Sequence, residues 1–145
     1  MAKHLKVSLK RFHGLEVTRI AVGNQKLVYI LIANRKYQYA HGKSSVGYIG
    51  TTKRGIARVA SSAAYRAEEM LGEYGVNKIV ARIITCKPRR NVETWVKLER
   101  ALLLAFRAQY GSVPLYNGQG NKIREKDEYR YFSREAVRKL IVELS

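Results

Sequence analysis

The chain has 145 residues, which is enough for one domain with its own hydrophobic core and too few for a second. A total of 28 lysines and arginines against 11 acidic residues leaves a net charge of +17, which favours nucleic acid as a partner over a membrane surface. The single cysteine, Cys86, excludes an internal disulfide and a cysteine-rich zinc site.

Strands are predicted at the start of the chain. Residues 5–9 and 15–22 alternate or are rich in β-branched side chains, and Gly14 and Gly23 punctuate them, so they are expected to form an extra β-hairpin. The continuous apolar run 27–33 is typical of a central buried strand. It is far too short to cross a bilayer, so we expect an intracellular protein.

A second strand, a helix and a third strand are predicted next. Polar, turn-rich residues 34–45 precede a strand at 46–50, which should pair with the apolar run as a hairpin with a long tip. Apolar residues at three- and four-residue steps predict a helix from about 53–55 to Leu71. Residues 76–85 then favour a strand.

Two more helices are predicted, and residues that commonly cap helices mark their ends. A helix is predicted from Asn91, its N-cap, to Tyr110, with Gly111 just beyond its end. A short strand at 129–132 should lead into a last helix capped by Ser133. The sequence therefore alternates strands with helices after its first hairpin.

This order predicts an α+β fold in one domain, 1–145. We expect a small, mainly antiparallel β-sheet flanked by three α-helices, with the extra N-terminal hairpin. The core should span about 27–120, between an N-terminal strand extension, 1–26, and a C-terminal helical extension, 121–145.

Glu99 lies where an acidic side chain is unusual, inside the apolar stripe of the predicted helix. The stripe comprises Val92, Trp95, Val96, Leu102, Leu103, Phe106 and Tyr110. A buried carboxylate needs a metal ion, an arginine or a hydrogen-bond network, because otherwise its burial costs several kcal/mol or raises its pKa. The alternatives are a glutamate at the edge of the stripe that reaches water, and a structural salt bridge.

Tyrosine, tyrosine, arginine, glutamate and asparagine follow one another in a recognisable order. They occur as Leu27-Val28-Tyr29, Gly47-Tyr48-Ile49-Gly50, Arg58 ten residues after Tyr48, Glu99, and Pro114-Leu115-Tyr116-Asn117. With this order, the stretch from Leu27 to Gly120 resembles the GIY-YIG nuclease family.

The resemblance implies a metal-dependent DNA endonuclease that hydrolyses phosphodiester bonds. Glu99 would hold Mg²⁺ or Mn²⁺, and Arg58 would stabilise the phosphorane. Tyr29 would act as the base while Tyr48 positions phosphate or water, or the two roles could be reversed, and Asn117 would anchor the site. One carboxylate can suffice for Mg²⁺, which keeps several waters and binds substrate phosphate.

The chain departs from the family pattern in three places. Its first motif lacks the glycine, and the hairpin between the two tyrosines is longer than usual. Ser62 stands one helical turn after Arg58, where the family usually carries a histidine or tyrosine that assists the base. Tyr65 on the same helix could replace it, His41 at the hairpin tip could reach in, or nothing replaces it.

Exposed cations are expected to contact phosphates and to make affinity depend on salt. The candidates are Lys53, Arg54, Lys87, Arg89, Arg90, Lys122 and Arg124. A run of charges can also be no more than a solvated surface.

The expected partner is DNA, double-stranded or branched, and cutting both strands would require a homodimer or two successive nicks. A different class of protein also fits the charge and size. It is a basic nucleic-acid-binding protein without catalysis, either of the ribosomal or nucleoid type or an inactive relic of a nuclease.

Overall fold

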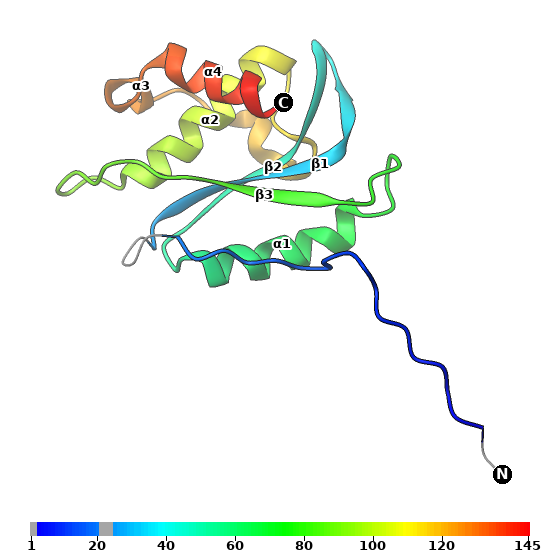
Figure 1. The fold of residues 1–145 in the computed structure, drawn as a ribbon. Coiled ribbons are helices and arrows are strands. Elements are labelled where there is room, and N and C mark those ends of the chain that lie inside the picture. Colours follow the sequence, from blue (N-terminus) through cyan, green and yellow to red (C-terminus); the bar gives the residue numbers. More distant parts are fainter. Residues whose placement is uncertain (1–2, 21–24) are drawn as a thin grey trace.

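The computed structural model describes residues 3–20 and 25–145 of the chain (Figure 1). Its elements are β1 (Leu27–Tyr39), β2 (Gly42–Thr52), α1 (Ile56–Met70), β3 (Ile79–Ile84), α2 (Thr94–Tyr110), the 3₁₀ helix η1 (Leu115–Lys122), α3 (Glu128–Tyr131) and α4 (Arg134–Leu144). The strands form one antiparallel sheet in the order β2-β1-β3. The predicted α+β class, with an antiparallel sheet and three main helices, is confirmed.

The central strand β1 has two buried faces, as its continuous apolar sequence predicts. Leu27, Tyr29 and Leu31 point to the side that α1 covers. Val28 and Ile30 point to the opposite side, where α2 packs. Figure 1 shows α1 on one face of the sheet and α2 with α4 on the other. Side chains that alternate along β1 therefore reach two separate cores.

The hairpin between β1 and β2 is regular almost to its end, so the prediction of a long tip at 34–45 is wrong. β1 continues to Tyr39 and β2 resumes at Gly42, with a shift of register between Ile32 and Tyr37. The Tyr39 ring packs edge-on against Phe106 of α2, and Tyr37 is buried as well. Burial of alternate tyrosines stabilises strand pairing through a segment whose polar composition favours a loop.

The predicted N-terminal hairpin is also wrong. Residues 3–20 contain no strand, although residues 21 and 22 of the second predicted strand lie outside the described part of the chain. Ile20 packs against the core beside α1, while Leu5, Val7 and Leu9 are exposed. An alternating sequence pattern favours an extended segment, but a β-strand also needs a neighbouring strand. None of the described residues pairs with the backbone of residues 3–20.

Around α2, α3 and α4, two predictions of local structure are wrong and two are confirmed. Residues 129–132 lie mostly in the helical turn α3, not in a strand. Asn91 has a φ of 59° in the loop before α2 and does not cap that helix. Gly111 ends α2 in the left-handed region, and the Ser133 side chain accepts a hydrogen bond from the Ala136 N–H, as predicted.

The C-terminal elements pack on α2. Val137 and Ile141 of α4 are buried against it. The carboxylate of Glu128, only 1% exposed, accepts a hydrogen bond from Arg100 Nε at 2.6 Å and another from the Lys126 N–H at 2.8 Å. Within residues 3–20 and 25–145, no helix has the length and apolar character needed to span a membrane.

Candidate active site

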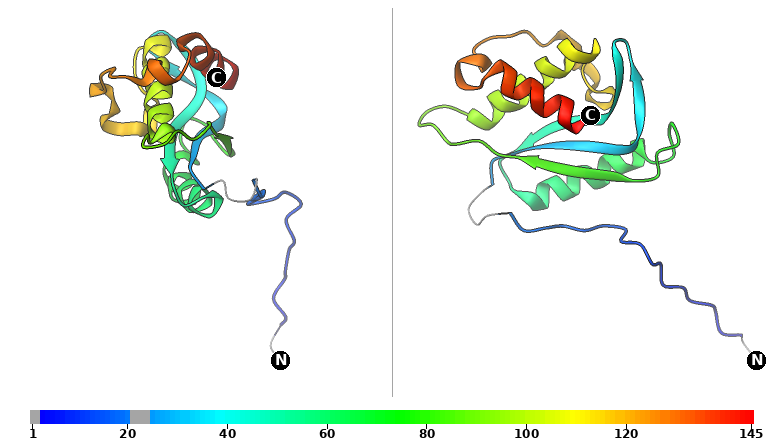
Figure 2. Two further views of the ribbon diagram at one scale, coloured as in Figure 1. Left: turned by 90° about the vertical axis from the view of Figure 1, so that its left-hand side faces the viewer. Right: turned by 45° about the horizontal axis from the view of Figure 1, so that its top comes forward.

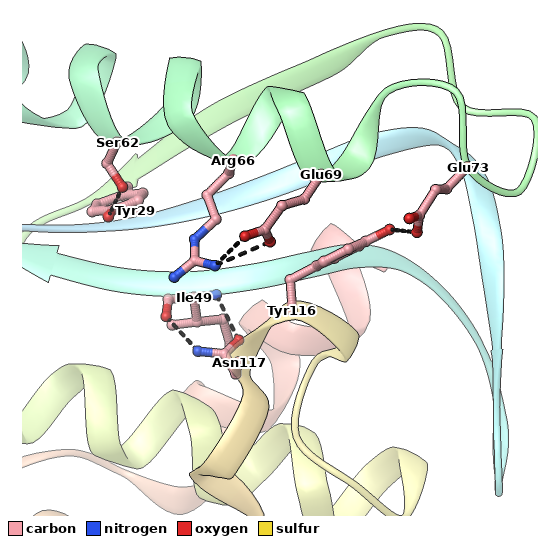
Figure 3. A network of polar contacts seen from close by, with 8 residues as sticks. All are labelled: Tyr29, Ile49, Ser62, Arg66, Glu69, Glu73, Tyr116 and Asn117. Carbon is pink, nitrogen blue, oxygen red and sulfur yellow. Dashed lines mark hydrogen bonds and ion pairs between the residues drawn. The ribbon is translucent and has the colours of Figure 1, made fainter.

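Tyr29 of β1 and Ser62 of α1 are joined by a short hydrogen bond. The two hydroxyl oxygens lie 2.5 Å apart, and the Tyr29 ring is buried beneath α1 (Figure 3). Burial raises the pKa of the Tyr29 phenol, and the bond to Ser62 acts in the opposite direction. The serine that departs from the family pattern is therefore the direct partner of the first tyrosine.

Tyr48 of β2 lies beside Tyr29, with 6.0 Å between the ring centroids. Gly50 stands directly opposite Tyr29 in the sheet. A Cβ at position 50 would lie 2.6 Å from the Tyr29 hydroxyl and 2.7 Å from the Tyr48 ring, closer than such atoms can approach. The glycine of the second motif therefore provides the space in which the two tyrosine rings meet.

Arg66 of α1 covers the second tyrosine. Its guanidinium carbon lies 4.3 Å from the centroid of the Tyr48 ring, and its Nη1 donates to both Glu69 carboxylate oxygens, at 3.1 and 3.3 Å (Figure 3). Burial by itself would lower the pKa of Arg66, but Tyr48 and Glu69 raise it above its ordinary value. Arg66 was not among the residues predicted from the sequence, although its spacing of four residues from Ser62 places it on the same face of α1.

The other predicted residues of α1 point outward. Arg58 is exposed one turn before Ser62, and within the described part of the chain no carboxylate lies within ion-pair distance of it. Tyr65 is 65% exposed, and its ring lies 5.7 Å from the guanidinium carbon of Arg66. Arg58, Ser62 and Arg66 thus form a line on α1, with Tyr65 to one side.

His41 is too distant to assist Tyr29. It forms the turn between β1 and β2, where its N–H donates to the Tyr110 carbonyl at 3.1 Å. Tyr29 and Tyr39 are ten residues apart along β1. At a rise of about 3.3 Å per residue, that separation is roughly 30 Å. The structure therefore excludes His41 as a replacement for the missing family residue.

Glu99 is half-buried on α2 and forms no hydrogen bond or ion pair with the other described residues. Burial, which disfavours the charged carboxylate, raises its pKa to about 7, and neighbouring Arg100 only partly offsets this. The sequence predicted a partner for this carboxylate. The described residues offer none, so the carboxylate is free to take a ligand.

The position of Glu99 along the sheet follows from the two ends of α2. Tyr110 at its end bonds the turn before β2, and Trp95 at its start lies 4.5 Å from Lys26 Nζ, next to the place where β2 ends. Helix α2 therefore runs antiparallel to β2. Glu99 follows Trp95 by one turn, about 6 Å, which places it along the second half of β2. Helix α2 packs on the face of the sheet opposite α1, so Glu99 belongs to the other face than Tyr29 and Tyr48. Among the described residues, no hydrogen bond or ion pair joins Glu99 to either tyrosine.

Asn117 of η1 binds the outer edge of β2 between Tyr48 and Gly50. Its side-chain carbonyl accepts from the Ile49 N–H at 3.0 Å, and its amide donates to the Ile49 carbonyl at 2.8 Å (Figure 3). Next to it, the Tyr116 hydroxyl bonds Glu73 at 2.8 Å. The Asn117 bonds hold η1 against the strand that carries Tyr48, and the Tyr116 bond joins η1 to the turn after α1.

The seven cations predicted to bind nucleic acid are all exposed. Lys53 and Arg54 follow β2, and Lys87, Arg89 and Arg90 follow β3. Because β2 and β3 are both antiparallel to β1, they end at the same end of the sheet, next to the start of β1. Lys122 and Arg124 lie elsewhere, around the end of η1. The first five cations thus follow strands that finish where β1 begins, and the guanidinium carbon of Arg89 lies 5.2 Å from the centroid of the Tyr131 ring of α3.

Among the described residues, no three histidine, cysteine, aspartate or glutamate side chains gather as a metal site. A cation would therefore depend on Glu99 together with water and substrate oxygens, a donor set that fits Mg²⁺. In comparisons with known proteins, no family model matches the chain, and neither a curated protein nor a solved structure shows significant similarity to it.

Proposed function

We propose that this chain is a metal-dependent DNA endonuclease that hydrolyses phosphodiester bonds by a GIY-YIG mechanism. The observation that supports this most strongly is the contact of Tyr29 with Tyr48 over Gly50, beneath the α1 residues Ser62 and Arg66. Strand tyrosines usually fill half-buried sheet positions. Two tyrosines that meet beneath the Arg66 guanidinium and the Ser62 hydroxyl, on the helix that carries the exposed Arg58, suit a reaction at phosphate.

Tyr48 is the better candidate for the base that takes a proton from water. Tyr29 is buried, and burial raises the pKa of its phenol more than the bond to Ser62 lowers it, which favours the neutral phenol. Tyr48 is less buried and lies against the Arg66 guanidinium. That positive charge stabilises the negative charge which a phenolate there would carry. The structure thus favours the reverse of the order that the family resemblance first suggested.

Glu99 is the residue that would hold the metal. Its carboxylate is half-buried, has a pKa of about 7 and forms no ion pair with the residues that the structure describes. A divalent cation bound there would neutralise charge on the phosphate and stabilise the leaving oxygen. The cation would also compete with the proton for the carboxylate, so binding should weaken below neutral pH.

Arg58 and the cations at the end of the sheet would hold the substrate. The Arg58 guanidinium is exposed in line with Ser62 and Arg66, and its planar donors match a non-bridging phosphate oxygen. The loop with Lys87, Arg89 and Arg90 would add affinity that falls with salt, by about 0.9 in log–log slope for each lost phosphate contact.

Plasmid cleavage tests this proposal. Supercoiled DNA should be nicked or linearised with Mg²⁺ or Mn²⁺ and stay intact with EDTA. Glu99→Gln should abolish cleavage while retarding DNA in a gel as the native protein does. The matched control is Glu143→Gln, at an exposed glutamate of α4, which should cut normally.

The charge of +17 supports a second candidate, a nucleic-acid-binding protein without catalysis. That function would be shown by DNA that stays intact under every metal condition although it is retarded with normal affinity. A Glu99→Gln variant that still cuts would contradict the assigned site and leave the endonuclease activity itself in place.

A further inference from the structure

Residues 3–12 form an exposed arm that the candidate active site does not use. Leu5, Val7 and Leu9 are 92%, 91% and 95% exposed, and Phe12 is exposed as well. Both views in Figure 2 show the arm leading away from the sheet and helices. Several aliphatic side chains exposed together in this way indicate a surface that a partner covers.

The sequence of the arm has the period of a strand. In an extended chain, Leu5, Val7 and Leu9 point to one side while Lys6 and Lys10 point to the other. The apolar side needs a surface to pack on, and the backbone needs a second strand to pair with. The open edge of a β-sheet would provide both the apolar surface and the strand to pair with.

Within the described part of the chain, the sheet has two outer edges, along β2 and along β3. Along β2, Asn117 occupies the outer N–H and carbonyl of Ile49. Along β3 no backbone hydrogen bond from the described residues reaches the outer edge of Ile79–Ile84. Val80 on this strand is 44% exposed. The outer edge of β3 thus offers both unpaired backbone and apolar surface.

We propose that residues 5–9 of one copy of the chain add as a fourth strand to the outer edge of β3 in a second copy. Ile20 packs beside α1, and the arm nearer the N-terminus extends away from its own sheet and helices (Figure 2). Nucleic acid would neutralise Lys6 and Lys10 and leave the three aliphatic side chains without a counterpart. If each copy gives its arm to the other, the exchange closes as a dimer.

Molar mass by light scattering across a concentration series tests the proposal. The native chain should form dimers, and the variant Leu5→Ser/Val7→Ser/Leu9→Ser should stay monomeric. The control Lys6→Ser/Lys10→Ser should form dimers at least as readily. Because the copies repel each other at +17 each, added salt should strengthen the dimer, whereas it weakens nucleic-acid binding.

Two results would overturn the proposal. The first is a native chain that stays monomeric at every concentration. The second is a dimer that survives the three serine substitutions, because the aliphatic side chains of the arm would then not hold it together; loss of that dimer in the lysine control would show that the arm acts through its charge.

Disulfide trapping identifies the strand that receives the arm. In a Cys86→Ser background, Leu5→Cys, Val7→Cys or Leu9→Cys in one chain should cross-link to Val80→Cys in another under mild oxidation. Ser61→Cys, at an exposed position of α1, replaces Val80→Cys as the control and should not cross-link. A chain that carries both cysteines and closes on itself as a monomer would show pairing within one copy and refute exchange.

Discussion

The side chain of Asn117 hydrogen-bonds both backbone groups of Ile49, although 68 positions separate the two residues in sequence. A primary amide has an acceptor and a donor side by side, the pair of groups that a neighbouring strand would present. Asn117 therefore takes the place of a further strand at the edge of β2. It keeps Tyr48 and Gly50, on either side of Ile49, in the position where the two tyrosines meet.

Replacing Asn117 with aspartate should destabilise the fold in a manner that depends on pH. Asn117→Asp keeps the acceptor for the Ile49 N–H but places a carboxylate oxygen against the Ile49 carbonyl. We expect the free energy of unfolding to fall by about 1–3 kcal/mol at pH 7. Part of this loss should be regained near pH 4, where a protonated carboxyl can donate. Urea unfolding at both pH values measures the difference.

Asn121→Asp is the matched control, because the Asn121 carbonyl accepts from the Val113 N–H and its amide group donates to none of the groups that the structure describes. It should unfold at nearly the native urea concentration. Equal losses in the two variants would show that the donor half of Asn117 is unimportant.

Removing the hydroxyl of Ser62 should leave the buried Tyr29 hydroxyl without its hydrogen-bond partner. Ser62→Ala is expected to lower the free energy of unfolding by about 1–2 kcal/mol, because Tyr29 loses the partner 2.5 Å away. Adding Tyr29→Phe should cost less than the sum of the two single changes, since no unpaired hydroxyl would remain. Ser61→Ala on the exposed side of α1 should have almost no effect in the same thermal unfolding assay.

The contact of Arg66 with the Tyr48 ring should contribute to cleavage. Arg66→Lys keeps the charge but loses the planar stack, so we expect a decrease of about 2- to 30-fold in the single-turnover rate, equivalent to the 0.5–2 kcal/mol of a cation–π contact. Arg138→Lys is the control, because Arg138 binds Glu135 in the same way and is exposed on α4. If both variants cut at the native rate, Arg66 has only a structural role.

Glu99 should make stability fall as the pH rises. Its pKa is about 7 in the folded chain against an ordinary 4.5, so its contribution is fully present below pH 4.5 and is lost by about pH 7. Glu99→Gln should therefore be more stable than the native chain at pH 8, by up to about 3 kcal/mol, and equal to it at pH 4. Added Mg²⁺ should stabilise only the native chain. Parallel pH curves for the two proteins would show that the carboxylate is fully hydrated.

The pair of Glu128 with Arg100 should hold the C-terminal helices on α2. Glu128→Ala removes a carboxylate that is 1% exposed and leaves the Lys126 N–H and the Arg100 Nε, on a side chain that is 27% exposed, without this acceptor, which should cost about 1–3 kcal/mol. Glu125→Ala breaks an exposed pair with Arg134, 3.1 Å apart, and should cost less than about 1 kcal/mol. Chemical denaturation of the two variants compares them, and similar losses would mean that burial of Glu128 is unimportant.

Elements whose signals are local were predictable from the sequence. The apolar run at the start of β1, the three- and four-residue spacing in α1 and α2, and the caps at Gly111 and Ser133 depend on neighbouring residues only. Predictions failed where a distant contact decides. Tyr39 extends the hairpin because Phe106 packs against it, and residues 5–9 form no strand because no described backbone pairs with them.

The sequence by itself determined the positive charge, the α+β class, the order of the motif residues and the unusual position of Glu99. Only the tertiary structure decided that Ser62 bonds Tyr29, that Arg66 covers Tyr48 and that Asn117 closes the edge of β2 at Ile49. The reason is physical, because spacing along one helix or strand determines which side chains share a face. Which faces then meet depends on how the helices pack against the sheet, and no local pattern contains that information.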